Sequence, residues 1–226
     1  MLRLEDIPRS DIEAIHRATM TVLREVGVKF PEKLAFKKLE TVGAEIDYQR
    51  QIARFPEEVI KKALGQAPQQ FTMYARRKEQ DIRVGQGKTY FKTSSIGIAV
   101  QDFETGKRRG STKEDVVKTA RLVDALPNIH VLDPMVSPGE VPTKLFDYYR
   151  LQLSLENSSK HICTLPGPAT GTKEAGDVIE IASCVVGGKD ELTKRPIISL
   201  IQEATSPLQY EPVSYTHLTL PTKRIV

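Results

Sequence analysis

Residues 129–165 read IHVLDPMVSPGEVPTKLFDYYRLQLSLENSSKHICTL. Two short apolar runs, at 129–132 and 161–165, flank a longer segment, 143–156, in which apolar residues recur at helical spacing. We therefore predict a strand, a helix and a second strand, in that order. Parallel strands joined by a helix form a right-handed unit in nearly all known sheets.

The alternation of strand and helix continues on both sides of this unit. Further strands are expected at 96–100 and 197–201, and further helices at 111–126 and 172–186. Open doubly wound sheets and closed eight-stranded barrels both use such units. A phosphate loop is not expected, because Pro168 removes an amide donor from the glycine-containing segment 167–171. The pattern favours an α/β fold, with the first half of a (β/α)8 TIM barrel, truncated, over residues 95–212.

Residues 1–94 have a different pattern, which predicts an N-terminal region of helices and short strands. Ser10 and Glu13 have the spacing of a capping box, and the helix that they begin is expected to end at Gly27. Pro31 and Pro56 are expected to begin two further helices. Short strands are expected at 71–75, 82–84 and 90–93.

The last residues read as a translated DNA-sequencing adapter. Residues 213–222 are VSYTHLTLPT, and we interpret 213–226 as a non-native tail that follows a natural sequence ending near Pro212. A segment of this kind is excluded from reasoning about fold. Removing its two charges, Lys223 and Arg224, lowers the net charge of the chain from +4 to +2.

The composition is that of an ordinary soluble globular protein, with 39% hydrophobic and 27% charged residues. Apolar runs fall short of the roughly 20 residues that a membrane span needs, and the N-terminus lacks a secretory signal. Basic residues do not form the patch expected of a nucleic-acid-binding protein. Two cysteines, Cys163 and Cys184, in different expected elements indicate reduced thiols in a cytoplasmic protein.

Polar residues at the carboxyl ends of barrel strands are the candidate site, because functional groups gather there in TIM barrels. These candidates are Ser95, Asp133, Lys160, His161 and Glu203. Glu203 is placed to face a cationic substrate or to cap the next loop, and Lys160 either meets an anion or is a structural lysine at the strand entry. A zinc site of Asp133, His161 and Cys163 is an alternative, although the ligand spacing is not that of a zinc motif.

Several short segments, in the same order along the chain, carry a family resemblance. They include Leu122-Val123-Asp124-Ala125-Leu126, Ser159-Lys160-His161 and Ser206-Pro207-Leu208. Together they resemble the trimethylamine methyltransferase family of corrinoid-dependent enzymes. The resemblance implies a barrel that moves a methyl group from a methylated amine, trimethylamine or a betaine, to the cobalt of a corrinoid. It also implies that a separate small protein holds the corrinoid, that the enzyme binds no cofactor or metal itself, and that the full-length protein is a homo-oligomer.

The resemblance suggests roles for the candidate residues. Glu203 and His161 are the expected catalytic residues, with Glu203 holding the ammonium. Lys160, Asp133 and Ser95 are the expected substrate-binding residues, and Lys160 or His161 would hold the carboxylate of a betaine. Two alternatives remain: an unrelated barrel hydrolase or lyase that uses His161 and Asp133 as acid and base, and an amine-binding protein without catalysis. We expect the truncated chain to be inactive alone.

Overall fold

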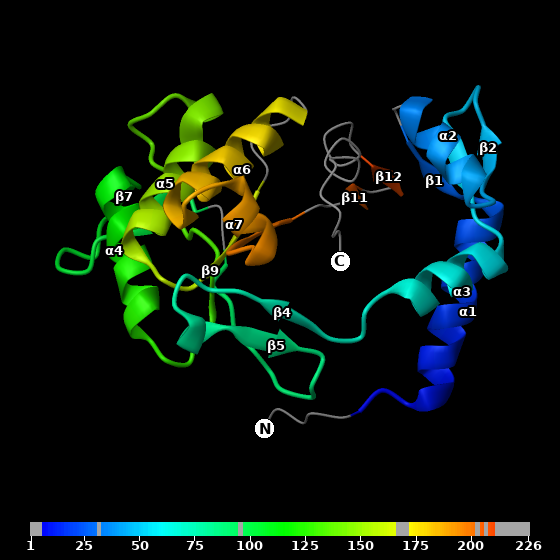
Figure 1. The fold of residues 1–226 in the computed structure, drawn as a ribbon, viewed down its shortest axis with the longest axis horizontal. Coiled ribbons are helices and arrows are strands. Elements are labelled where there is room, and N and C mark those ends of the chain that lie inside the picture. The colour runs from blue at the N-terminus through cyan, green and yellow to red at the C-terminus, as the bar shows by residue number, and fades with distance from the viewer. Residues whose placement is uncertain are drawn as a thin grey trace. The chain divides into compact units, whose positions relative to one another are not determined.

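The computed structural model describes residues 6–30, 33–94, 97–165, 172–201, 204–205 and 208–210, and Figure 1 labels their elements. Contacts divide the chain into two compact units. The first comprises the described residues up to Ala67 and those from 204 to 210, and the second those from Pro68 to Ile201. The domain boundary that the sequence pattern placed at residue 95 stays a prediction.

The first unit combines three helices with a small mixed sheet. Its helices are α1 (Arg9–Glu25), α2 (Lys33–Thr41) and α3 (Glu57–Gln66). Its strands are β1 (Val28–Lys29), β2 (Glu45–Asp47), β3 (Ile52–Arg54), β11 (Ala204–Thr205) and β12 (Gln209–Tyr210). The sheet order is β11-β12-β1-β3-β2, and only β1 and β12 are parallel. The three helices confirm the sequence-based expectation, whereas the sheet was not expected.

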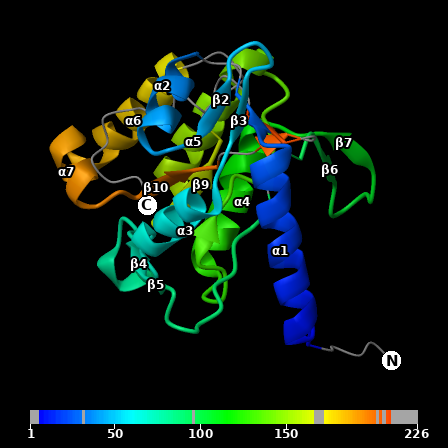
Figure 2. The ribbon, with the colours of Figure 1, turned by 90° about the vertical axis from the view of Figure 1, so that its right-hand side faces the viewer.

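Helix α1 ends as expected but begins differently. Figure 2 shows it as one straight helix, which starts at Arg9 after Pro8 and has no side-chain cap, so the predicted capping box does not form. The Ser10 hydroxyl instead bonds Asp11, because Ser10 already lies inside the helix. Gly27, with φ of 78°, ends the turn, and a Cβ there would lie 2.4 Å from the Ala53 carbonyl oxygen. Only glycine fits this position.

The second unit contains a three-stranded parallel sheet, in the order β10-β9-β8. Its strands are β8 (Val131–Leu132), β9 (His161–Thr164) and β10 (Ile198–Leu200). The 3-10 turn η2 (Thr143–Leu145) and helix α5 (Phe146–Asn157) join β8 to β9, and α6 (Thr172–Val186) and α7 (Lys189–Lys194) lie between β9 and β10. These strand–helix–strand units confirm the α/β prediction. The strands of the described residues do not close into a barrel, so the TIM barrel itself stays a prediction.

The helices cover one face of this sheet. Leu132 and Ile162 of the strands pack with Leu151 of α5 and Val178 of α6 in a single buried cluster. Burying each such side chain stabilises the unit by about 1.5 to 3 kcal/mol. Because side chains alternate along a strand, the residues on either side of Ile162 point to the opposite face of the sheet.

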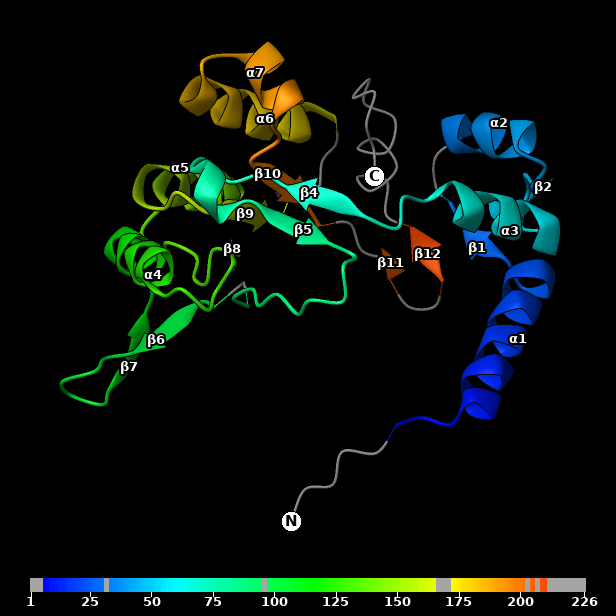
Figure 3. The ribbon, with the colours of Figure 1, turned by 60° about the horizontal axis from the view of Figure 1, so that its bottom comes forward.

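Two antiparallel hairpins complete the second unit, and Figure 3 shows both. One joins β4 (Phe71–Met73) to β5 (Ile82–Val84) through the 3-10 turn η1 (Lys78–Gln80), and the other joins β6 (Ala99–Gln101) to β7 (Arg108–Gly110). Of the strand expected at 96–100, residues 99 and 100 do form a strand, but they pair antiparallel with β7, so the expectation of a parallel barrel strand is wrong for these two residues. The reason is the tight turn after β6, where the Thr105 amide and hydroxyl donate to Asp102 Oδ1 and Gly106 adopts a φ of 68°. None of the helices in the described part of the chain is long and apolar enough to cross a membrane.

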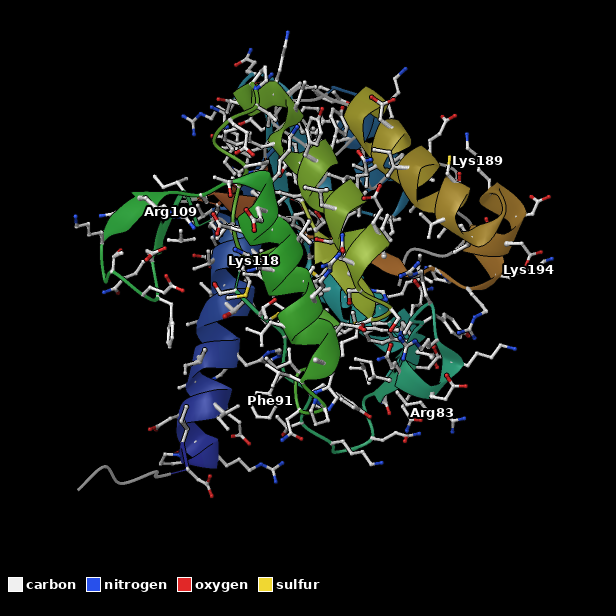
Figure 4. All side chains as sticks on the ribbon, turned by 90° about the vertical axis from the view of Figure 1, so that its left-hand side faces the viewer. Arg83, Phe91, Arg109, Lys118, Lys189 and Lys194 are labelled. Atoms are coloured by element: carbon white, nitrogen blue, oxygen red, sulfur yellow. The ribbon has the colours of Figure 1, made fainter. Side chains whose placement is uncertain are left out.

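A capping box forms at the start of α4 (Lys113–Ala125), the helix expected at 111–126. The Thr112 hydroxyl accepts from the Asp115 amide, and Asp115 accepts from the Thr112 amide at 2.9 Å. Arg109 of β7, labelled in Figure 4, donates to both Asp115 oxygens, at 2.6 and 2.9 Å. The Arg109 guanidinium and the Thr112 donors hold the pKa of Asp115 well below its usual range.

This capping box makes the free energy of unfolding depend on pH. The folded-state pKa of Asp115 lies below its unfolded value, so its contribution is present above about pH 4 and declines as the pH falls below that value. We expect Asp115→Asn to lower the melting temperature at neutral pH and to flatten its decrease between about pH 5 and 3. Thermal melts followed by circular dichroism would test this, and an equally steep acid transition in the variant would contradict it.

Candidate functional site

Four residues line up on the face of the β8–β10 sheet that the helices leave uncovered. Ser199 pairs in register with Cys163. Val131 pairs with His161, so Asp133, two residues after Val131, lies beside Cys163, two residues after His161. Lys92 forms a parallel bridge with Val131, and its side chain reaches Asp133. We call Lys92, Asp133, Cys163 and Ser199 the carboxyl-end row. Asp133 directly follows β8, and Cys163 and Ser199 each lie one residue before the carboxyl end of their strand, whereas Lys92 reaches Asp133 with its long side chain.

Asp133 is the most deeply buried of these residues. Its side chain is 1% exposed, and Lys92 Nζ donates to Oδ2 at 2.6 Å. The Thr93 hydroxyl donates to the Asp133 carbonyl at 2.7 Å and accepts from the Asp133 amide at 2.8 Å. Burying an unpaired carboxylate would cost several kcal/mol, and the ion pair with Lys92 offsets part of that cost. Among the described residues, Asp133 Oδ1 has no hydrogen-bond partner.

Arg150 of α5 fixes the loop that follows Asp133. Its side chain is 1% exposed. Nη2 donates to the Pro134 carbonyl at 2.6 Å, and Nη1 donates to Asp147 Oδ1 at 2.8 Å. A planar guanidinium with both ends engaged leaves the backbone at Pro134 little freedom. Arg150 thereby positions the neighbouring Asp133.

Cys163 contributes a neutral thiol to the row. Burial raises the pKa of this thiol, and the charge of Asp133 acts in the same direction, whereas the Lys92 ammonium opposes them. The thiolate is the nucleophilic form of cysteine, so a raised pKa makes the thiol unreactive at neutral pH. This favours the expectation that Cys163 is a packing residue.

The two cysteines should therefore differ in reactivity. Cys184 on α6 is exposed, whereas Cys163 is partly buried. With iodoacetamide at neutral pH, we expect Cys163 to react more slowly than Cys184, because Cys163 is partly buried and its raised pKa lowers the fraction of reactive thiolate. Mass spectrometry of the peptides measures both rates, and unfolding in urea is the control that should equalise them. Equal rates in the folded chain would contradict the assignment.

Lys160 and His161 lie at the amino end of β9, not at the carboxyl end where we expected them. Lys160 Nζ donates to three backbone carbonyls near the end of α4: Val123 at 2.5 Å, Leu126 at 2.6 Å and Ile129 at 2.5 Å. An ammonium has three protons, and all of them are used here. Burial lowers the pKa of Lys160, and the charge of Asp124 acts in the opposite direction. Hydrogen bonds to the three carbonyls also favour the charged form. This geometry gives Lys160 a structural role in capping α4.

His161 is held by the segment that follows β4. Its Nδ1 lies 2.8 Å from the Tyr74 carbonyl, which can only accept, so Nδ1 carries the proton. Burial lowers the pKa of His161, which keeps the ring neutral. His161 pairs in register with Val131, which precedes Asp133 by two residues. His161 is therefore offset from Asp133 by about 6.6 Å along the strand direction. The two are therefore not side by side, as an acid–base pair would need to be.

Two of the predicted site residues, Ser95 and Glu203, lie outside the described residues. Lys92 and Ser199 belong to the row but were not among the candidates. Ser199 has a visible signal, since it is the polar residue between Ile198 and Leu200. Within the described ranges, groups of three or more His, Cys, Asp or Glu suited to a metal ion are absent. The roles predicted for the remaining residues stay predictions.

Comparison with known proteins gives one family. The sequence profile described as trimethylamine methyltransferase (MTTB) matches residues 3–221. The chain is 28% identical over 206 residues to a glycine betaine methyltransferase of Desulfitobacterium hafniense, covering 91% of this chain and 42% of that protein. It is 27% identical to the trimethylamine methyltransferase MttB of another strain of that species, covering 88% of this chain and 40% of the relative. The trimethylamine methyltransferase MttB of Methanosarcina thermophila is also 27% identical, and the match covers 88% of this chain and 42% of that protein.

The extent of these matches has two consequences. The chain spans about two fifths of the length of the curated relatives that it matches. The family match also runs into the tail from 213 to 221, so the adapter interpretation of that tail stays a prediction. Because the match covers nearly the whole chain, the chain belongs to the trimethylamine methyltransferase (MTTB) family.

Proposed function

We propose that the protein to which this chain belongs transfers a methyl group from a methylated amine to the cobalt of a corrinoid held by a partner protein. The observation that carries the proposal is the family match over residues 3–221. The names of the relatives, which are methyltransferases for trimethylamine and glycine betaine, support it. The corrinoid is a second substrate that arrives on the partner and supplies the methyl-accepting metal.

The carboxyl-end row supports the binding of an amine in this reaction. A methylammonium group must be removed from water and aimed, and a buried carboxylate can hold its charge while doing so. Asp133 fits this task, because Oδ1 is buried and has no hydrogen-bond partner among the described residues. A quaternary ammonium has no N–H and needs an anionic contact of this kind rather than a hydrogen bond. Asp133 therefore binds and orients the amine, and Lys92 and Arg150 hold Asp133 in place.

The complete gene product and its corrinoid partner test the proposal. The partner is reduced, trimethylamine or glycine betaine is added, and the absorbance change of the methylated corrinoid is followed. We expect methylation that requires enzyme, amine and partner together. Tight binding of the amine without any methylation would contradict the proposal and favour a binding protein. Turnover of the amine without a corrinoid would favour a different enzyme class.

A further inference from the structure

The Cys163 thiol lies in the middle of the carboxyl-end row. Asp133 lies beside it on one neighbouring strand, and Ser199 pairs with it on the other. Adjacent strands are about 4.8 Å apart, so Asp133 and Ser199 lie roughly 10 Å apart with Cys163 between them. Cys163 is partly exposed, whereas the Asp133 side chain is only 1% exposed. The thiol is therefore the accessible group beside a buried carboxylate.

The charges around this thiol suit a cation. Asp133 Oδ1 is buried and has no hydrogen-bond partner among the described residues. Buried oxygens of this kind normally accept a hydrogen bond, so this atom points to a ligand independently of the cysteine. The other neighbours add no charge, because Ser199 is neutral and burial lowers the pKa of His161, which precedes Cys163 by two residues on the same face.

The Lys92 charge fixes the side of Asp133 on which a cation lies. Lys92 Nζ donates to Asp133 Oδ2 at 2.6 Å, and this ammonium repels a second cation. Lys92 bridges Val131 of β8, and β9 pairs with the opposite edge of β8. A cation that faces Asp133 and avoids Lys92 therefore lies over Cys163. This placement requires the repulsion from Lys92 and no contact with it.

A thiol suits the alkyl groups of such a cation. Burial raises the pKa of Cys163, so the side chain is neutral at neutral pH. Cysteine then behaves as a small apolar residue with a polarizable sulfur. Because close-packed groups respond to a change of a single methylene, the size of this side chain limits the size of the group that packs on it.

We propose that Cys163 forms the floor for the N-alkyl groups of the bound ammonium and thereby limits the size of the ammonium head that the site accepts. This inference rests on the proposed function, in which Asp133 holds the amine, and adds the residue that sets the size limit. Cys163 is a specificity-determining residue. Its thiol packs against the substrate and takes no part in bond formation.

Two symmetrical cations isolate the effect of size. Tetramethylammonium and tetraethylammonium carry the same charge and lack N–H groups, and each arm of the second is one methylene longer. Isothermal titration of the complete gene product measures both affinities without a corrinoid. We expect tetramethylammonium to bind at least about tenfold more tightly, because one extra methylene in a tight pocket has an effect of that size. Equal affinities, or binding of neither cation, would overturn the inference.

Variants of Cys163 assign the size limit to its side chain. Cys163→Ala opens space and should strengthen the binding of tetraethylammonium at least about fivefold. Cys163→Val fills space and should weaken the binding of tetramethylammonium by a similar factor. Cys184→Ala and Cys184→Val, at the exposed cysteine of α6, are the matched controls and should change neither affinity. Unchanged affinities in both Cys163 variants would overturn the inference.

A measurement on the wild-type protein does not depend on the folding of any variant. At ten times its dissociation constant, tetramethylammonium should slow the alkylation of Cys163 by iodoacetamide about tenfold, because the bound cation covers the thiol. The rate at Cys184 should not change. Mass spectrometry of the peptides measures both rates. An unchanged rate at Cys163 would overturn the inference even if every variant fails to fold.

The outcomes separate this inference from the proposed function. A size limit that depends on Cys163, without methylation of the corrinoid, would uphold the inference and contradict the methyltransferase proposal. Methylation of the corrinoid, together with affinities and alkylation rates that show no role for Cys163, would do the reverse.

Discussion

Replacing Lys160 with methionine should lower the free energy of unfolding of the second unit by about 3 to 5 kcal/mol, because three hydrogen bonds from a charged donor are lost. The Lys160 ammonium donates to the carbonyls of Val123, Leu126 and Ile129, and the variant removes this donor. The Val123 and Leu126 carbonyls keep one backbone amide donor each, whereas the Ile129 carbonyl loses the donor that Lys160 supplies. An unsatisfied buried carbonyl costs about 1 to 3 kcal/mol. The methionine side chain fills similar space, so the loss reports the hydrogen bonds rather than a cavity.

Lys118→Met is the matched control for this experiment. Lys118, labelled in Figure 4, lies on α4, the helix whose end Lys160 caps. Its side chain is 66% exposed and pairs with Glu114. Its loss should change stability by less than about 0.5 kcal/mol, which is typical of an exposed pair. Urea titrations of both variants give the comparison. If Lys160→Met melts like the wild type but binds the amine weakly, the substrate-binding role suggested by the sequence is right and the structural role is wrong.

Replacing Arg150 with methionine should be about equally destabilising, by about 3 to 5 kcal/mol, because a buried ion pair is broken. Asp147 loses its guanidinium partner and the Pro134 carbonyl loses its donor. The melting temperature should fall by roughly 10 °C, given about 2 to 4 °C per kcal/mol for a chain of this size.

Arg121→Met is the control for Arg150. Arg121 donates to Asn157 at 2.9 Å in an exposed position, and its loss should shift the melting temperature little. Differential scanning calorimetry of the two variants and the wild type measures the effect. Similar melting temperatures for Arg150→Met and Arg121→Met would contradict the view that Arg150 holds the loop after Asp133.

The sequence predicted the α/β alternation well because each element has its own local signal. Helix α6 occupies the predicted residues 172–186, and β9 begins at the predicted residue. The sheet of the first unit was missed because strands of two or three residues are too short to show alternation. The hairpin of β6 and β7 was missed because an apolar run at 96–100 is compatible with either a parallel or an antiparallel partner.

The candidate site was predicted less well, for a reason of geometry. Lys160 and His161 are close to Cys163 in the sequence, but they lie at the amino end of β9, whereas Cys163 lies toward its carboxyl end. Of these three residues, only Cys163 lies near Asp133. Lys92 was missed because its long side chain crosses to a neighbouring strand, which a pattern within one segment cannot reveal. Ser199 required the register between β9 and β10.

The central claim is that the carboxyl-end row binds the methylated amine through Asp133. The most direct test is the rate of methyl transfer by Asp133→Asn in the complete gene product, which keeps the shape of the side chain but removes its charge. We predict a fall in kcat/KM of at least about 100-fold, comparable to the loss of one preorganised charge contact in other enzymes. A variant that folds normally and transfers methyl groups within about twofold of the wild-type rate would contradict this claim.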